Sequence, residues 1–124
     1  MKKIIVLCLA ALSAGCGRGK STADLLEQMR SKESAQRLHA IEALGHRGQE
    51  AAVVAPALAL ALRDEDAFVR RDAAEALGRI GPGARHTTPA LVATLKDRKA
   101  NVRLAAARAL KRIDPDAMAR AGRK

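Results

Sequence analysis

Three residues in the first half of the chain have the types and the helical spacing that a zinc site would need. His39, Glu42 and His46 stand at positions i, i+3 and i+7, which places them on one face of a helix. Two imidazoles and a carboxylate are suitable zinc ligands. The two histidines are nevertheless two turns apart, about 10 Å along the axis at 1.5 Å per residue. One ion cannot bridge that distance, so the sequence predicts no metal site.

No other set of residues has the pattern of a catalytic site. The sequence lacks a Ser-His-Asp order, a nucleophile elbow and a paired Cys/His cluster. Residues 15–21 (GCGRGKS) end like a phosphate-binding loop, but the leading glycine and the preceding strand are missing. We therefore expect a protein that is not an enzyme and that has no cofactor.

The first 15 residues have the pattern of a cleaved export signal. Met1-Lys2-Lys3 is a basic start, Ile4 to Leu12 is an apolar run of nine residues, and small residues follow. Such a run is far shorter than the roughly 20 residues that cross a bilayer as a helix. We expect residues 1–15 to be removed, residues 16–21 to be a short tether, and the mature chain to be exported.

Cys16 stands at the expected cleavage junction. The segment Ser13-Ala14-Gly15-Cys16 resembles the lipobox of bacterial lipoproteins, except that Ser13 stands where leucine is commonest. The resemblance implies that Cys16 becomes lipidated and N-terminal, and that the chain is anchored in the cell envelope. In a host with two membranes, Gly17 after the cysteine favours the outer membrane, facing the periplasm. The alternatives are ordinary cleavage that frees a secreted protein, or a free thiol at Cys16.

The charge balance predicts an acidic partner. The chain has 23 Lys and Arg against 13 Asp and Glu, a net charge of +10, and removal of Lys2 and Lys3 leaves +8. Such an excess favours an acidic protein, anionic lipid or an anionic envelope polymer. Phe68 is the single aromatic residue, so the sequence lacks the stacking platforms of nucleic-acid binders. Export also argues against nucleic acid as the partner.

The mature sequence repeats with a period of 33 residues. The segment Ala40–Gly45 (AIEALG) falls on Ala73–Gly78 (AAEALG), and that segment falls on Ala106–Lys111 (AARALK). The same shift superposes further pairs: Pro56 on Pro89, Leu58 on Leu91, Leu62 on Leu95, Asp64 on Asp97, Val69-Arg70 on Val102-Arg103, and Ile80 on Ile113. This agreement predicts three structural units, at about 22–48, 55–81 and 88–114.

Each unit should contain two helices, and nothing in the mature part alternates as a strand would. We expect short first helices at 22–29, 55–62 and 88–95, and longer second helices at 34–44, 67–80 and 100–113. Thr22 and Thr88 are candidate N-caps, and Pro89 suits a first helical position. Pro56 would suit one too, although the alanine-rich segment from Glu50 could start that helix earlier. The fold class is therefore all-α, followed by a short basic tail at 115–124 with about one helical turn.

The spacing Pro56…Asp64…Val69-Arg70, repeated as Pro89…Asp97…Val102-Arg103, resembles the HEAT repeat. The residue pattern of the units also resembles the PBS-lyase HEAT-like repeat. The resemblance implies an α-solenoid of three hairpins in a right-handed superhelical stack. The first unit departs from the pattern and looks like a capping repeat. The resemblance also implies structural roles, holding the register across turns, for the repeated residues Arg37, Arg70, Arg103, Asp64, Asp97, Pro56 and Pro89.

The resemblance further places the second helices on the inner, binding surface of the solenoid. Their expected outward columns are His39, Asp72 and Ala105; Glu42, Glu75 and Arg108; and His46, Arg79 and Arg112. This surface becomes more positive along the stack, and the candidate residues for an acidic partner are Arg71, Arg79, Arg108, Lys111 and Arg112. The alternative is a solvated face on which Glu75 and Arg79 form an i,i+4 pair.

These observations predict a membrane-anchored interaction module or scaffold that binds a protein with an acidic surface. An electrostatic binder of anionic envelope polymer or lipid is the first alternative. The second comes from the family name alone, because some PBS-lyase-type proteins attach or detach bilin chromophores. An exported chain without aromatics to stack a tetrapyrrole fits that activity poorly.

Overall fold

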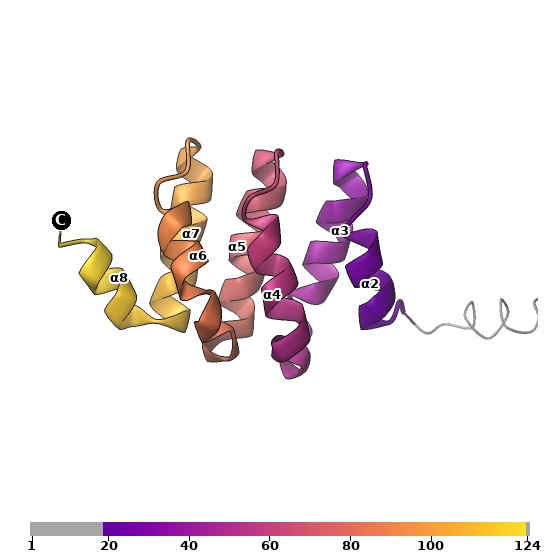
Figure 1. The fold of residues 1–124 in the computed structure, drawn as a ribbon, viewed down its shortest axis with the longest axis horizontal. Coiled ribbons are helices and arrows are strands. Elements are labelled where there is room, and N and C mark those ends of the chain that lie inside the picture. The colour runs from indigo at the N-terminus through magenta and orange to yellow at the C-terminus, as the bar shows by residue number, and fades with distance from the viewer. Residues whose placement is uncertain (1–18, 124) are drawn as a thin grey trace, which may run out of the picture.

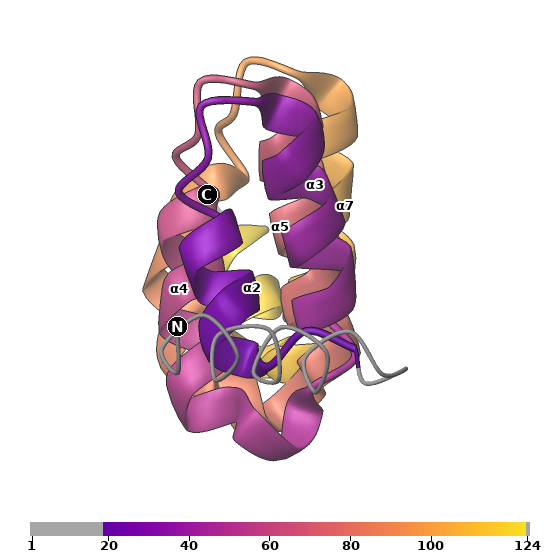
Figure 2. The same ribbon diagram turned by 90° about the vertical axis from the view of Figure 1, so that its right-hand side faces the viewer.

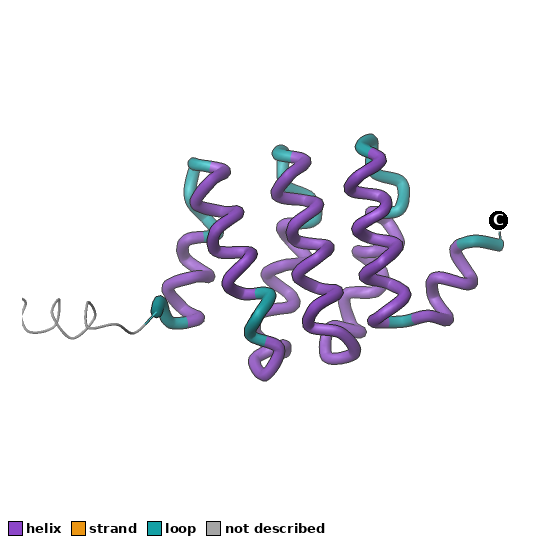
Figure 3. The backbone as a smooth tube through the Cα atoms, turned by 180° about the vertical axis from the view of Figure 1, so that it is seen from behind, coloured by secondary structure: helices purple, strands orange, loops and turns teal. Residues whose placement is uncertain are grey.

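The computed structural model describes residues 19–123, and within this range the chain folds into helices and their connecting turns (Figure 3). The expected all-α class is confirmed. The proposed signal at 1–15 and the lipidation site Cys16 lie outside the described residues. None of the described helices has the length and apolar character needed to cross a bilayer.

The described helices form three hairpins in a row (Figure 1). The first helices are α2 (Thr22–Gln28), α4 (Ala51–Ala61) and α6 (Thr88–Thr94), and the second helices are α3 (Ser34–Leu44), α5 (Ala67–Ile80) and α7 (Ala100–Ile113). Short 3₁₀ segments at Gly48–Glu50 and Gly81–Thr87 join one unit to the next, and α8 (Pro115–Ala121) follows the third hairpin. Viewed along the row, α2 and α4 lie in one layer, and α3, α5 and α7 lie in the other (Figure 2).

Side chains cap the first free amides of α2, α5 and α8, and two of the expected N-caps differ from what the structure shows. Ser21, not Thr22, caps α2: its hydroxyl accepts from the Asp24 amide at 3.1 Å, and Asp24 Oδ2 accepts from the Ser21 amide at 3.0 Å. Helix α6 follows Thr87 rather than having Thr88 as its cap, because the preceding 3₁₀ segment runs directly into it. Pro89 lies in the first turn of α6, where its missing amide costs nothing.

Pro56 lies inside α4 and not at its first helical position. Helix α4 begins at Ala51, as the alanine-rich segment after Glu50 allows, so the proline is five residues into the helix. The proline is exposed on the outer layer, and its ring points away from the core. The alanines before the proline favour a helix, so α4 is already formed where it reaches Pro56.

The core runs as a continuous strip between the two layers. Its largest fully buried side chains come from every unit: Leu25, Ile41, Leu44, Leu58, Leu77, Leu91, Leu110, Val54, Val69 and Val102. Between neighbouring second helices the contacts are made by alanine and glycine. A Cβ placed on Gly78 would lie 3.2 Å from the Cα of Ala109, so the absence of a side chain lets α5 and α7 approach closely.

The segment after the third hairpin is more ordered than a polar tail with one turn. Asp114 is buried and caps α8, because its Oδ1 accepts from the Ala117 amide at 3.1 Å. Pro115 occupies the first turn, and Ala117 is buried against the third hairpin. Residues 115–121 therefore form a packed helix that covers part of the last hairpin.

Candidate interaction site

The two columns of arginine and aspartate meet between neighbouring units. Arg37 donates from Nε to Asp64 Oδ2 at 2.9 Å and from Nη2 to Asp64 Oδ1 at 3.0 Å. Arg70 makes the same fork with Asp97, at 2.8 and 3.2 Å. Each pair spans 27 residues and ties one second helix to the turn of the following unit. Paired parallel bonds of this kind fix both distance and orientation.

Each arginine of the column also holds its own turn. Arg37 Nη1 donates to the carbonyls of Ser31 and Lys32 at 2.9 and 3.0 Å. Arg70 Nη1 donates to the carbonyls of Asp64 and Glu65 at 2.8 and 3.1 Å. The guanidinium therefore joins three segments: its own helix, its own turn and the next turn.

The protein environment shifts the ionisation of these groups. Burial alone would raise the pKa of Asp97, but the Arg70 hydrogen bond, the Lys99 amide and nearby positive charge outweigh burial, and the pKa lies below its ordinary value. The hydrogen bond to Asp64, opposed by burial, raises the pKa of Arg37. Both shifts favour the charged form of the group concerned, the carboxylate of Asp97 and the guanidinium of Arg37.

Arg103 is the third arginine of the column and makes only half of these contacts. Its Nη1 donates to the carbonyls of Asp97 and Arg98 at 2.7 and 3.1 Å, as in the other two units. Among the described residues, no carboxylate forms an ion pair with it. Arg103 therefore presents Nε and Nη2 to the surface.

Three of the five candidate arginines and lysines surround one hollow on the second-helix layer. Arg79, Arg108 and Arg112 line this hollow of about 230 Å³ between α5 and α7, together with Glu75. Its floor is made of Gly78, Ala105 and Ala109, whose small size creates the depression. Arg108 and Arg112 are exposed and have no acidic partner among the described residues. We call this surface, Glu75, Arg79, Arg108 and Arg112, the basic hollow.

The structure places the other two candidates outside the basic hollow. Arg71 is half-buried, pairs with Asp72 at 2.8 Å and stacks over the Phe68 ring, with 5.3 Å between the guanidinium carbon and the ring centroid. The hydrogen bond to Asp72 raises the pKa of Arg71. Lys111 is exposed on α7 but does not line the hollow.

The ion pair within α5 that we gave as the alternative does not form, and Arg79 pairs between units instead. Arg79 donates from Nη2 to Glu42 Oε2 of the first unit at 3.2 Å, and not to Glu75. This bond, opposed by partial burial, lowers the pKa of Glu42. That alternative considered α5 alone, but the close approach of α3 and α5 brings Glu42 within reach of Arg79. One further expected position is wrong: Ala105 is buried between α5 and α7 and does not face outward.

The histidine cluster has the geometry of a surface pair. His46 Nε2 lies 3.4 Å from Glu42 Oε1, and Glu42 is shared with Arg79. No group of three or more His, Cys, Asp or Glu within residues 19–123 is placed to hold a metal ion.

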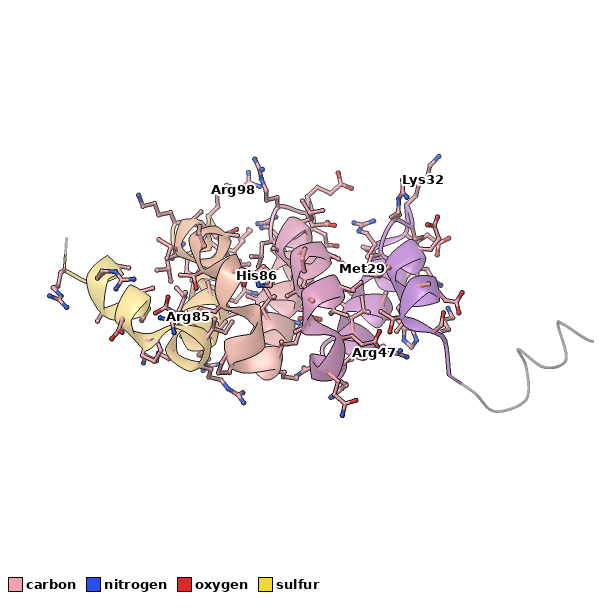
Figure 4. All side chains as sticks on the ribbon, turned by 60° about the horizontal axis from the view of Figure 1, so that its bottom comes forward. Met29, Lys32, Arg47, Arg85, His86 and Arg98 are labelled. Atoms are coloured by element: carbon pink, nitrogen blue, oxygen red, sulfur yellow. The ribbon has the colours of Figure 1, made fainter. Side chains whose placement is uncertain are left out.

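A groove on the first-helix layer was not foreseen. It lies between α2 and α4, has a volume of about 520 Å³, and is lined by apolar side chains that include Leu26, Val53 and Leu60. Met29, which also lines it, is labelled between these helices in Figure 4. Val53 and Leu60 are seven residues apart on α4 and more than half exposed. That spacing in an apolar helix was the available signal, but the helix was expected to begin at residue 55, which left Val53 outside it.

Comparison with known proteins agrees with this architecture. The chain is similar to the structure of the complex of CpcE and CpcF of phycocyanin lyase from Nostoc sp. PCC7120, with a TM-score of 0.75 and 28% identity. It is also similar in fold to a crystal structure of an engineered protein, with a TM-score of 0.65 and 23% identity. The alignments cover 86% and 84% of this chain but only 42% and 52% of those chains, so it spans about half of their length. A comparison with curated proteins gave no match.

The family described as HEAT repeats matches residues 4–78 and 54–121, which together cover most of the sequence. The repeated hairpins and the Arg–Asp pairs between units account for that match in physical terms. The chain belongs to the HEAT repeat family.

Proposed function

We propose that this protein is a non-catalytic interaction module that binds an acidic protein surface through the basic hollow. The observation that carries the proposal is the convergence of Arg79, Arg108 and Arg112 on one depression with an alanine and glycine floor. Guanidinium groups bind carboxylates in paired geometry, and a shallow floor lets a partner side chain approach them. Nothing in the basic hollow has the nucleophile and base that a reaction would need.

The distribution of charge supports this choice of surface. Residues 88–114 contain seven Lys and Arg against two Asp and Glu, whereas residues 22–48 contain four of each. One of those two acids, Asp97, is already paired with Arg70. The positive excess of the chain therefore lies largely on the third unit, where it attracts acidic partners over about a Debye length.

Charge reversal at the basic hollow tests the proposal. Arg108→Glu with Arg112→Glu should reduce the partner recovered by crosslinking in the producing cells by about ten-fold, since close charge pairs across an interface contribute a few kcal/mol. The matched control, Arg63→Glu with Arg120→Glu, changes the net charge equally at exposed positions outside the hollow that have no ion pair among the described residues. Equal losses in the two variants would contradict the proposal and leave only a general effect of charge.

The second part of the proposal is that lipid on Cys16 holds the module at a membrane face of the cell envelope. Its support is the lipobox-like segment 13–16 after a short apolar run. The tether 17–20 reaches only about 13 Å at full extension, so the repeats would work close to that membrane. Palmitate labelling should be lost in Cys16→Ala, and labelling that persists in this variant would exclude the anchor. In a host with two membranes we expect the outer membrane, facing the periplasm.

A second candidate function is electrostatic binding of anionic envelope polymer or lipid, which the basic third unit favours. Binding of the full chain to acidic liposomes or cell-wall polymer should then disappear at ~0.3 M salt, because exposed charges are screened. Recovery of a defined protein by crosslinking, without binding to liposomes or polymer, would favour the acidic protein partner instead.

A third candidate is suggested by the 28% identity with the phycocyanin lyase complex. The chain spans 42% of the aligned chain of that complex, and Phe68 is its single aromatic residue. Incubation with bilin and an acceptor protein, followed by absorbance, decides the matter. A covalent, coloured product would replace the binding module with a lyase-like activity.

A further inference from the structure

The arginine column contains a preformed carboxylate site that the described chain uses twice and leaves open once. Arg37, Arg70 and Arg103 hold their own turns with the same pair of bonds from Nη1 to two carbonyls, at 2.7–3.1 Å. These bonds fix the guanidinium plane. In the first two units, Nε and Nη2 then donate to an aspartate carboxylate of the following unit at 2.8–3.2 Å.

Arg103 has the same fixed guanidinium with no described carboxylate in front of it. Because its turn bonds match those of Arg70, its Nε and Nη2 face in the direction from which a fourth unit would approach. The next residue, Leu104, is 51% exposed. Lys111 is exposed at the position where its repeat equivalent, Gly78, contacts the following helix. We call Arg103, Leu104 and Lys111 the open end.

The charge around the open end selects an acidic occupant. Lys96, Arg98 and Lys99 lie on the turn that Arg103 holds, and all are exposed. Figure 4 shows Arg98 projecting from the edge of the stack formed by these turns. A fixed guanidinium beside further cations binds a carboxylate more strongly than a lone surface arginine does, because its rotamer is already ordered.

A second copy of this chain stacked in the same register would not supply that carboxylate. The position equivalent to Asp64 and Asp97 in the first unit is Ser31. Ser31 keeps the local role of the aspartates, since its hydroxyl accepts from the Glu33 amide at 3.2 Å. It brings no charge, and Lys32 beside it would meet the cations of the open end. A second copy in this register therefore does not fit the open end, which favours a partner protein that carries an acid.

We propose that the open end is a docking site for a partner protein that inserts an aspartate or glutamate from a turn into the Arg103 fork and packs an apolar side chain against Leu104. The inference deepens the proposed function, because it rests on the protein being an interaction module, and it adds a second contact at the end of the stack. The occupant is defined by its chemistry, a carboxylate with a neighbouring apolar group, as in the pairs between units.

The carboxylate site can be tested on the full chain with acetate as the probe. In NMR spectra of arginine Nε–Hε groups, the Arg103 signal should shift with acetate and saturate at a concentration at least about five-fold lower than that for Arg98. Arg37 and Arg70 should not respond, because their forks are occupied. If Arg103 responds no more strongly than Arg98, the preformed site does not exist and the inference fails.

The docking surface can be tested with a photoreactive benzophenone residue in place of Leu104, in the cells that produce the protein. The crosslinked product should fall by about ten-fold with Arg103→Gln and should persist with the matched control Arg63→Gln, an exposed arginine outside the open end. The crosslinked segment of the partner should contain an acid whose amide variant gives the same loss. Equal effects of the two arginine variants, or a segment without an acid, would overturn the proposal. The same photoreactive residue in place of Arg112 distinguishes failure of this inference from failure of the proposed function. Crosslinks at 112 without crosslinks at 104 refute the open end alone, and crosslinks at neither position refute the proposed function as well.

Discussion

The pair between Arg70 and Asp97 should contribute more to stability than any other polar contact between the described units. The side chains of Arg70 and Asp97 are only 7% and 11% exposed. Replacing Arg70 with methionine keeps most of the aliphatic stem but removes four hydrogen bonds, two to the carboxylate and two to turn carbonyls. It also leaves Asp97 charged and largely buried, with the Lys99 amide still donating to it at 2.9 Å.

The expected cost can be estimated from these contacts. Breaking a buried ion pair by removing one partner costs about 3–5 kcal/mol, and the partial exposure here favours the lower end. Arg103→Met removes only the two bonds to carbonyls near the surface, for which about 1 kcal/mol is expected. The two substitutions are chemically identical and occupy equivalent positions, so the difference of about 2 kcal/mol isolates the contact between units.

Thermal and urea unfolding, followed by circular dichroism of the mature chain, measure both variants. For a domain of this size, a loss of 3 kcal/mol lowers Tm by about 12–24 °C. The dependence on urea concentration should keep its slope, which would show that the loss lies in the folded state. If Arg70→Met and Arg103→Met destabilise the protein equally, the aspartate contributes nothing across the unit boundary and the reasoning about the column is wrong.

Three further results are expected from the same measurements. Gly81→Ala should cost about 1–3 kcal/mol, because Gly81 has φ +75° and ψ −144°, whereas Gly48→Ala, where a new Cβ meets nothing within 4 Å, should change stability little. Leu77→Ala, at a fully buried position, should cost about 2–5 kcal/mol, and the exposed Leu60→Ala should stay within about 0.5 kcal/mol. Since the pKa of Asp97 is lower in the folded state, its contribution to stability is present above about pH 4 and is lost as the pH falls through the pKa of the folded state. The free energy of unfolding should therefore fall less steeply with decreasing pH in Asp97→Asn.

The sequence predicted the second helices closely because their evidence is local and repeated. The structure begins and ends α3, α5 and α7 at the expected residues, 34–44, 67–80 and 100–113. Their apolar faces recur at helical spacing, and turn residues bound each of them. Among the first helices, α2 and α6 begin at the expected residues, whereas α4 begins at Ala51 and not at 55, since Pro56 is compatible with more than one starting point. The side chain or 3₁₀ segment that fixes each start acts through geometry that a single sequence does not display.

The candidate site depended on distances between units, and there the sequence was less informative. Shared helical position grouped Arg79 with Arg112 correctly on one face, but it could not reveal that Arg79 pairs with Glu42. It also could not reveal that Arg71 is engaged with Asp72 and Phe68. Both outcomes follow from how closely the second helices approach, and small residues such as Gly78 set that approach.

The same close approach explains why a polar column is needed at all. Moving α7 along α5 by one turn, 5.4 Å, would place Ala105 where Ala109 lies now, and small apolar surfaces would meet in either position. The Arg70–Asp97 fork does not survive that shift, because paired bonds of about 3 Å break once the carboxylate moves by a turn. We therefore expect Arg70→Met with Asp97→Leu to keep its helix content and much of its stability, since an apolar pair can replace a buried ion pair at little cost. The variant should nevertheless populate more than one register between the second and third units, visible as broadened or doubled NMR signals from α7. Sharp, single signals would show that alanine packing alone specifies the register.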